Sequence, residues 1–208
     1  GAVMVGIIDY GVGNLFSLRS SFASIGVEAV VSGDPQVLAG CDRLVLPGVG
    51  AFGDAAEKLR QNGLDEFVRG QAASGKPLLG ICLGMQLLFE KSYEYGIHVG
   101  LGLLQGQVVP MAGRIPGSLK IPHMGWNKLE LQKESRLLKD GEYVYFVHSY
   151  YAIHCEPSLA ATAEYGIPIT AAVEQGNVFG CQFHPEKSGT VGLEILRAFT
   201  QLKEEDLC

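Results

Sequence analysis

Short apolar runs alternate with longer mixed segments along the first half of the chain. Each run fits a strand buried on both faces, and the mixed segments between the runs have the length and composition of helices. This alternation of strands with helical segments predicts a parallel sheet with helices on both faces. The predicted strands are 3–8, 28–31, 43–46 and 77–81, and the predicted helices are 14–25, 51–62, 64–74 and one starting within 85–89.

After about residue 96 the segments become shorter, and apolar and polar residues alternate within them. This alternation is typical of antiparallel strands. Residues 96–106 are rich in glycine and predict irregular structure or a short hairpin, and 189–202 predict a closing helix. The expected fold is therefore an α/β open sheet in three layers, with a parallel core extended by antiparallel strands. The predicted strands here are 107–110, 120–122, 128–131, 143–147, 160–164, 169–173 and 178–182.

Composition narrows the class of protein. With 208 residues, 47% of them hydrophobic, the chain can form one domain over 1–208 around a single core. Gly1 and Ala2 look like a cloning remnant. A net charge of −6 disfavours a broad nucleic-acid-binding face. No apolar run resembles a signal peptide or a membrane span.

The cysteines point to a reducing compartment. There are five, at positions 41, 82, 155, 181 and 208, an odd number with irregular spacing. They form no C-x-x-C pair, so neither a disulfide framework nor a metal site is indicated. We therefore expect a cytoplasmic protein without a metal.

One cysteine stands in a pattern with chemical meaning. The apolar strand 77–81 runs through Gly80 into Cys82 and Gly84, and a helical segment follows. Such a strand–turn–helix needs glycines because the turn is tight, and it lifts the residue at the turn above the sheet edge. Unpaired N–H groups at the start of the helix favour the thiolate. Cys82 is thus a candidate nucleophile, although a buried structural cysteine is the alternative.

A candidate partner for this thiol lies about a hundred residues later, where the predicted strand 178–182 leads to His184, Pro185 and Glu186. In an extended segment, residues two apart point the same way, so His184 and Glu186 are expected to face the thiol side of the sheet together. A carboxylate can hold one imidazole nitrogen and orient the other toward a nucleophile. The combination predicts a Cys82–His184–Glu186 catalytic triad.

Five motifs together resemble the triad-type (class I) glutamine amidotransferases, and among them the glutaminase subunits of imidazole glycerol phosphate synthase. The likeness covers residues 3 to about 199. It implies a flavodoxin-like fold, L-glutamine as the substrate and no cofactor. The motifs are DYGVGNL at 9–15, GICLGMQ at 80–86, PHMGWN at 122–127, YFVHSYY at 145–151 and QFHPE at 182–186.

The resemblance also implies roles for residues around the triad. The segment 47–50 would be an oxyanion strand, whose N–H groups at Gly48 and Val49 join that of Leu83 to stabilise the attacked carbonyl. From the sequence alone, 47–50 is an ordinary strand-to-helix loop. The implied glutamine pocket consists of Gly50, Gln86, His148, Ser149 and Tyr150.

A partner surface is implied as well. Without the resemblance, Asn14 reads as a helix cap, Trp126 as a core aromatic and Lys187 as a solvated lysine. His98, His123 and His154 match no ligand spacing, which predicts structural or exposed histidines. The implied interface residues are Asn14, Met124, Trp126, Asn127, Tyr145 and Lys187.

The chemistry implied is hydrolysis of glutamine, with ammonia passed to a (β/α)₈-barrel cyclase subunit in a heterodimer. That cyclase would make imidazole glycerol phosphate and aminoimidazole carboxamide ribotide in histidine biosynthesis. The chain itself shows no phosphate cradle for an acceptor, which fits an acceptor site on another protein. The alternatives are a sister glutaminase of the anthranilate- or carbamoyl-phosphate-synthase type, a peptidase-like thiol hydrolase, and a catalytically inactive adaptor.

Overall fold

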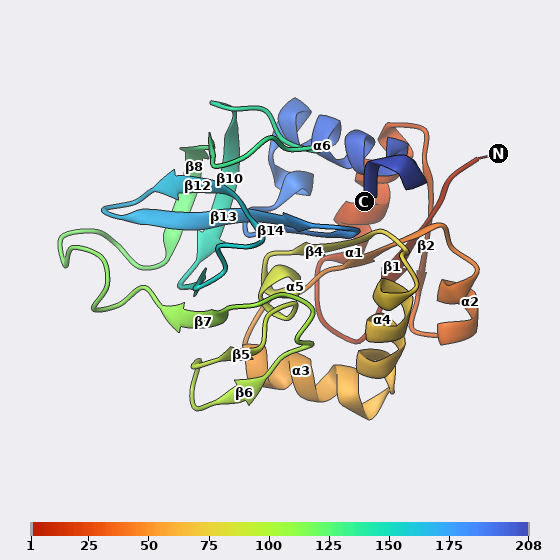
Figure 1. Ribbon diagram of the computed structural model, residues 1–208, viewed down its shortest axis with the longest axis horizontal. Helices are drawn as coiled ribbons and strands as arrows, with labels where there is room; N and C mark the ends of the chain where they lie inside the picture. The colour runs from red at the N-terminus through yellow and green to blue at the C-terminus, as the bar shows by residue number, and fades with distance from the viewer. Residues whose placement is uncertain (1, 208) are drawn as a thin grey trace.

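An eight-stranded sheet forms the centre of the molecule, in the order β2-β1-β3-β4-β14-β13-β12-β9. The computed structural model describes residues 2–207, so Gly1 of the expected cloning remnant and Cys208 lie outside the described residues. Strands β2 to β14 in this order pair in parallel, and β13, β12 and β9 add antiparallel strands (Figure 1). The strands are β1 (Met4–Ile8), β2 (Glu28–Ser32), β3 (Arg43–Leu46), β4 (Leu78–Ile81), β9 (Glu130–Leu131), β12 (Leu159–Glu164), β13 (Pro168–Gln175) and β14 (Val178–Cys181).

Helices cover both faces of this sheet, as the alternating pattern predicts. Helices α1 and α6 pack on one face around Phe22 and Phe199, and α2, α3 and α4 pack on the other around Phe52. Figure 1 shows α6 on one side of the sheet and α3 on the opposite side. The α-helices are α1 (Leu15–Ser24), α2 (Pro35–Ala39), α3 (Phe52–Gln61), α4 (Leu64–Ala73), α5 (Leu83–Gln86) and α6 (Gly189–Gln201).

Two smaller sheets and two 3₁₀ turns complete the fold. One sheet pairs β10 with β8, and the other has the order β11-β7-β5-β6. The turn η1 (Pro185–Lys187) follows β14, and η2 (Glu204–Leu207) follows α6. The remaining strands are β5 (Lys91–Ser92), β6 (His98–Val99), β7 (Gln107–Pro110), β8 (His123–Lys128), β10 (Tyr143–His148) and β11 (Tyr150–Ile153).

The expected fold class is confirmed, and the differences are local. The strand predicted at 120–122 is wrong, because these residues lie in a loop and the strand begins at His123. The strand predicted at 128–131 is divided between the end of β8 and β9, which belong to different sheets. Helix α2 was not predicted, although Asp34 caps it and Pro35 occupies its first turn.

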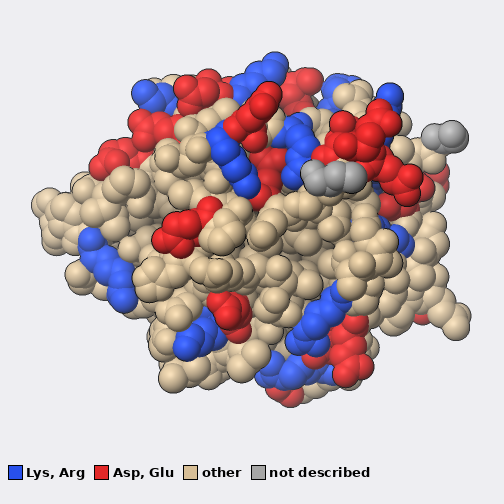
Figure 2. All heavy atoms as spheres, in the orientation of Figure 1, with Lys and Arg blue, Asp and Glu red and all other residues tan. Residues whose placement is uncertain are grey.

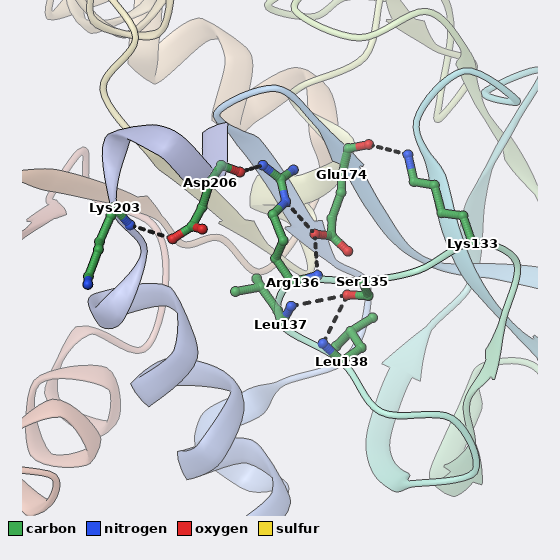
Figure 3. A network of polar contacts seen from close by, with 8 residues as sticks. All are labelled: Lys133, Ser135, Arg136, Leu137, Leu138, Glu174, Lys203 and Asp206. Atoms are coloured by element: carbon green, nitrogen blue, oxygen red, sulfur yellow. Dashed lines mark hydrogen bonds and ion pairs between the residues drawn. The ribbon is translucent and has the colours of Figure 1, made fainter. Parts of the chain in front are cut away.

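A buried carboxylate ties the C-terminal segment to the sheet (Figure 3). Glu174 of β13 is 3% exposed, and its Oε1 accepts from the backbone N–H of Arg136 at 3.1 Å and from its Nε at 3.3 Å. The same guanidinium donates to the carbonyl oxygen of Asp206 in η2, and Lys133 donates to the Glu174 carbonyl oxygen. Removing the arginine would leave a buried charge unpaired, so this network fixes the loop before β10 against the chain end.

Charged side chains lie mainly around the rim of the face shown in Figure 2, where acidic and basic groups are interspersed. This view shows no continuous basic field. Within residues 2–207, no helix is both long and apolar enough to span a membrane.

Candidate active site

The predicted turn at Cys82 is present and strained. Cys82 joins β4 to α5 with φ 55° and ψ −114°, a left-handed conformation that non-glycine residues rarely adopt. Its neighbours must be glycine. A Cβ on Gly84 would lie 1.8 Å from the carbonyl oxygen of Leu46, and a Cβ on Gly80 would lie 2.7 Å from that of Gly84. The helix that follows is one turn, beginning at Leu83, shorter and earlier than the segment 85–89 predicted.

His184 and Glu186 form a buried pair beside this turn. His184 Nδ1 lies 2.6 Å from Glu186 Oε1, and their side chains are 4% and 3% exposed. Burial by itself lowers the pKa of His184, but the nearby Cys82 sulfur and the Glu186 carboxylate raise it to about 9. The extended geometry expected from the sequence is wrong in one respect: Pro185 starts the turn η1, which folds Glu186 back onto the ring.

The other ring nitrogen is left for chemistry. His184 Nε2 is buried and makes no hydrogen bond within the described residues, although Cys82 is near enough to raise the pKa of His184. The Cys82 sulfur instead lies 3.9 Å from the carbonyl oxygen of Val147 and 3.8 Å from Nε2 of Gln182. Apo sites often have such loose geometry that tightens with substrate.

Cys82 and His184 share a cavity of about 440 Å³. Gln86 lies on its wall and donates its amide Nε2 to the carbonyl oxygen of Tyr150 at 3.2 Å and to Gln182 Oε1 at 3.1 Å. Those two bonds leave Gln86 Oε1 for a ligand. The other lining residues are Val49, Gly50, Ala51, Leu83, Glu94, Tyr95, Val147, His148, Ser149, Tyr150 and Lys187.

His148 lines the cavity, but its ring is committed elsewhere. Nε2 lies 2.9 Å from His123 Nδ1, and Nδ1 lies 2.9 Å from the carbonyl oxygen of Tyr150. Both nitrogens therefore have protein partners, and the role of His148 in the glutamine pocket stays a prediction.

Glu94 and Tyr95 also line the cavity and were not predicted from the sequence. Glu94 Oε1 accepts from the N–H of Phe52, the first residue of α3, at 3.0 Å. Burial raises the pKa of this carboxyl. Tyr95 packs edge-on to Tyr150 with ring centroids 6.4 Å apart. No local signal in the sequence marks Glu94, because its partner is 42 residues away.

A backbone carbonyl of the segment 47–50 lies where the oxyanion of the substrate was expected to bind. The N–H of Leu83 donates to the carbonyl oxygen of Gly48 at 3.3 Å, so this donor is already occupied. Tyr10 holds the preceding residue, with its hydroxyl 2.6 Å from the Pro47 carbonyl oxygen. The expected donors of Gly48, Val49 and Leu83 therefore do not converge here. The reason is that a carbonyl of this segment points where its N–H was expected.

Beside the cavity lies an exposed apolar face. Met124 and Trp126 of β8 are 60% and 57% exposed, so the core alternative for Trp126 is wrong. Tyr145 of the neighbouring strand β10 packs edge-on to Trp126, with ring centroids 6.1 Å apart. Asn14 is exposed and also caps α1, with its Oδ1 3.3 Å from the N–H of Ser17. Lys187 is exposed at the cavity rim.

Asn127 does not belong to this face, contrary to expectation. Side chains alternate along a strand, so Asn127 points to the side opposite Trp126. Its Nδ2 donates to the carbonyl oxygen of Glu164 at 2.9 Å and lies 3.1 Å from His123 Nε2. Its amide is thus used inside the protein.

Of the three histidines without ligand spacing, His123 is buried, His98 half-buried and His154 exposed.

Comparisons with known proteins show the family of this chain. The family model for "Glutamine amidotransferase class-I" matches residues 6–202. The chain is 52% identical to "Imidazole glycerol phosphate synthase subunit HisH" of Bacillus licheniformis, covering 97% of this chain and 98% of the relative. It is 50% identical to the protein of the same description from Methanothermobacter thermautotrophicus, covering 96% and 98%. The chain therefore belongs to the class-I glutamine amidotransferases and, within them, to the HisH family of imidazole glycerol phosphate synthase subunits.

Solved structures support the fold. "Structure of PurLQS from Thermotoga maritima" superposes with a TM-score of 0.75 at 20% identity, covering 96% of this chain and 98% of that one. "Crystal structure of glutamine amidotransferase" gives 0.74 at 24% identity, covering 94% and 96%. At these identities the likeness concerns the fold alone.

Proposed function

We propose that this chain hydrolyses L-glutamine to glutamate and ammonia through a thioester on Cys82, as one subunit of a two-subunit enzyme. The observation that carries the proposal is the strained cysteine at the strand–helix turn, which shares a cavity with a buried histidine–carboxylate pair. Membership of the HisH family selects glutamine over the substrates of other thiol hydrolases. The intact triad argues against the inactive adaptor.

Each step uses atoms that the site supplies. The Cys82 thiolate attacks the side-chain amide carbon, and protonated His184 gives its Nε2 proton to the departing ammonia. A thioester joins the glutamyl group to Cys82. His184, now neutral, takes a proton from water, whose oxygen attacks the thioester and releases glutamate and thiolate. Glu186 on Nδ1 holds the ring so that Nε2 faces the sulfur, and it favours the protonated form.

The ammonia requires an acceptor on another protein. In water near neutral pH, ammonia is mostly protonated and is not a nucleophile, so it must travel by an enclosed path. We propose the (β/α)₈-barrel cyclase subunit of imidazole glycerol phosphate synthase as the partner, in a heterodimer located in the cytoplasm. The four described cysteines are all unpaired, as a reducing compartment would leave them.

The test of this function is glutamate release measured with and without the cyclase and its ribotide substrate. We expect turnover that rises when both are present. Turnover that instead responds to an anthranilate- or carbamoyl-phosphate-synthase partner would favour the sister glutaminases. Hydrolysis of peptides, with none of glutamine, would favour the thiol hydrolase.

Glu94 offers a negative charge for the α-ammonium group of glutamine. Its Oε1 is bound to the Phe52 N–H, and Oε2 remains for a ligand at the cavity wall. Glu94→Gln removes the charge and keeps the shape. We expect KM for glutamine to rise about tenfold, because a charge-assisted hydrogen bond is lost, with a smaller change in kcat. An unchanged KM would place the ammonium elsewhere.

Trp126 is proposed to anchor the partner. Since its ring is more than half exposed and packs edge-on against Tyr145, truncation removes little packing in the free chain. Trp126→Ala is expected to weaken cyclase binding by about 2 kcal/mol while leaving thermal unfolding of the isolated chain nearly unchanged. Titration calorimetry and a thermal scan measure the two quantities. Undiminished cyclase affinity would remove Trp126 from the interface.

A further inference from the structure

A row of hydrogen-bonded side chains connects strand β8 to the cavity wall and takes no part in the chemistry above. Asn127 Nδ2 lies 3.1 Å from His123 Nε2, and His123 Nδ1 lies 2.9 Å from His148 Nε2. His148 Nδ1 lies 2.9 Å from the carbonyl oxygen of Tyr150. The same oxygen accepts from Nε2 of Gln86, whose amide faces the cavity. The row thus ends on two residues of the cavity wall.

The first end of this row determines which atoms carry protons. The N–H of Lys128 donates to Asn127 Oδ1 at 2.7 Å, and the carbonyl oxygen of Glu164 accepts from Asn127 Nδ2 at 2.9 Å. These two backbone groups can each play one role only, so they orient the amide. Nδ2 is therefore the donor to His123, whose Nε2 is unprotonated and whose Nδ1 carries the hydrogen.

The second end gives the same answer independently. The carbonyl oxygen of Tyr150 can only accept, so His148 Nδ1 carries a hydrogen and its Nε2 is the acceptor. That assignment requires His123 Nδ1 to donate, as the first end also requires. The three bonds from Asn127 through His123 and His148 to the Tyr150 carbonyl oxygen therefore run in one direction, through two neutral Nδ1–H rings. Gln86 donates to the same oxygen from the cavity side.

Burial keeps both rings neutral and in place. It lowers the pKa of His123 to about 4 and, as the largest of several causes, that of His148 to about 3. His123 is stacked between Phe146 and Tyr165, with centroid separations of 4.7 and 4.2 Å. Neither ring can serve as the acid or base of the reaction near neutral pH, so the row acts through position.

Strand β8 presents its other face to the outside. Met124 and Trp126 are exposed, and they alternate along the strand with His123, which is buried, and Asn127, which is half-buried. We infer that His123 is a positioning residue. With Asn127 and His148, it fixes the Tyr150 carbonyl and the Gln86 amide relative to strand β8. Glutamine affinity then depends on where a partner places this strand. This inference rests on the proposed glutaminase activity.

Two substitutions separate hydrogen bonding from packing. His123→Phe keeps the stacking on Phe146 and Tyr165 and removes the donor to His148. His123→Asn sacrifices the stacking and keeps a donor close to the Nδ1 position. In the complex with the cyclase, His123→Phe is expected to raise KM for glutamine about 3- to 10-fold with little change in kcat, the effect of losing one hydrogen bond. His123→Asn is expected to retain most of the wild-type KM.

Tyr165→Phe is the matched control, since it keeps the ring beside His123 and removes only a hydroxyl bonded to the Lys120 carbonyl oxygen. It should leave KM unchanged. An increase in KM for His123→Asn with none for His123→Phe would mean that packing alone matters, and this result would overturn the inference. If His123→Phe fails to fold, Asn127→Ala tests the same row and should also raise KM.

A spectroscopic readout distinguishes this inference from the proposed function. Nitrogen-15 NMR of labelled histidine in the wild-type chain should show both His123 and His148 as neutral Nδ1–H tautomers. An Nε2–H tautomer for either ring would contradict the row even if glutamine is hydrolysed. Correct tautomers without any hydrolysis of glutamine would reject the function and leave the row as a structural element.

Discussion

Cys82→Ala should lose glutamine hydrolysis by at least about 10³-fold while the chain folds and binds its partner normally. The thiolate is the group that forms the thioester, and Cys82 is the one cysteine among the described residues that line the cavity. The alanine side chain is smaller than that of cysteine and sits at the same strained turn, so the fold should tolerate it. Glutamate release in the presence of the cyclase, together with thermal unfolding, measures both effects.

Two controls make this result specific. Cyclase turnover supplied with free ammonium should survive in Cys82→Ala, because the acceptor site lies on the partner. Cys181→Ala should keep glutamine turnover, since Cys181 is buried on β14 and burial raises the pKa of its thiol. Glutamine hydrolysis in Cys82→Ala above about a hundredth of the wild-type rate would show that another group is the nucleophile.

Val49→Gly should raise glutamine hydrolysis by the unstimulated enzyme about tenfold. In the structure, the Gly48 carbonyl oxygen accepts from the Leu83 N–H. Rotation of the Gly48–Val49 peptide would turn this carbonyl away and point the Val49 N–H toward the same position. Such a rotation drives the φ of Val49 to positive values, which costs about 1–2 kcal/mol for a residue with a Cβ. Glycine removes that cost. One missing oxyanion donor is worth about 10²–10³ in rate, so the orientation of this peptide can govern activity.

Val49→Ala is the matched control for the rotating peptide. It removes the two methyl groups but keeps the Cβ that disfavours positive φ, so its unstimulated rate should stay near that of the wild type. Steady-state glutaminase assays with and without the acceptor ligand on the cyclase measure the effect. We expect Val49→Gly to narrow the ratio of stimulated to unstimulated rates. An equal rise in both variants would attribute the effect to loss of the side chain and not to peptide rotation.

Much of the architecture follows from local pattern. Strands β1, β3 and β4 are short apolar runs, and helices α1, α3 and α4 lie within one or two residues of the predicted bounds. The turn at Cys82 was also predictable, because a side chain at Gly80 or Gly84 would collide with backbone. Strands β8 and β11 were not predicted, since both belong to small sheets whose pairing partners lie far away in sequence.

The sequence by itself determined the parallel core, the glycine-bounded cysteine and the His184–Glu186 pair, because short-range sterics and spacing control each of them. Only the tertiary structure decided what the remaining polar groups do. The N–H of Phe52 donates to the Glu94 carboxylate and holds it at the cavity, and the His148 ring is hydrogen-bonded to His123. The direction of Asn127 depends on how β8 packs, and the orientation of the Gly48 carbonyl depends on its contact with Leu83. Hydrogen-bond partners far apart in sequence leave no periodicity to detect, so these roles emerge only when the strands are assembled.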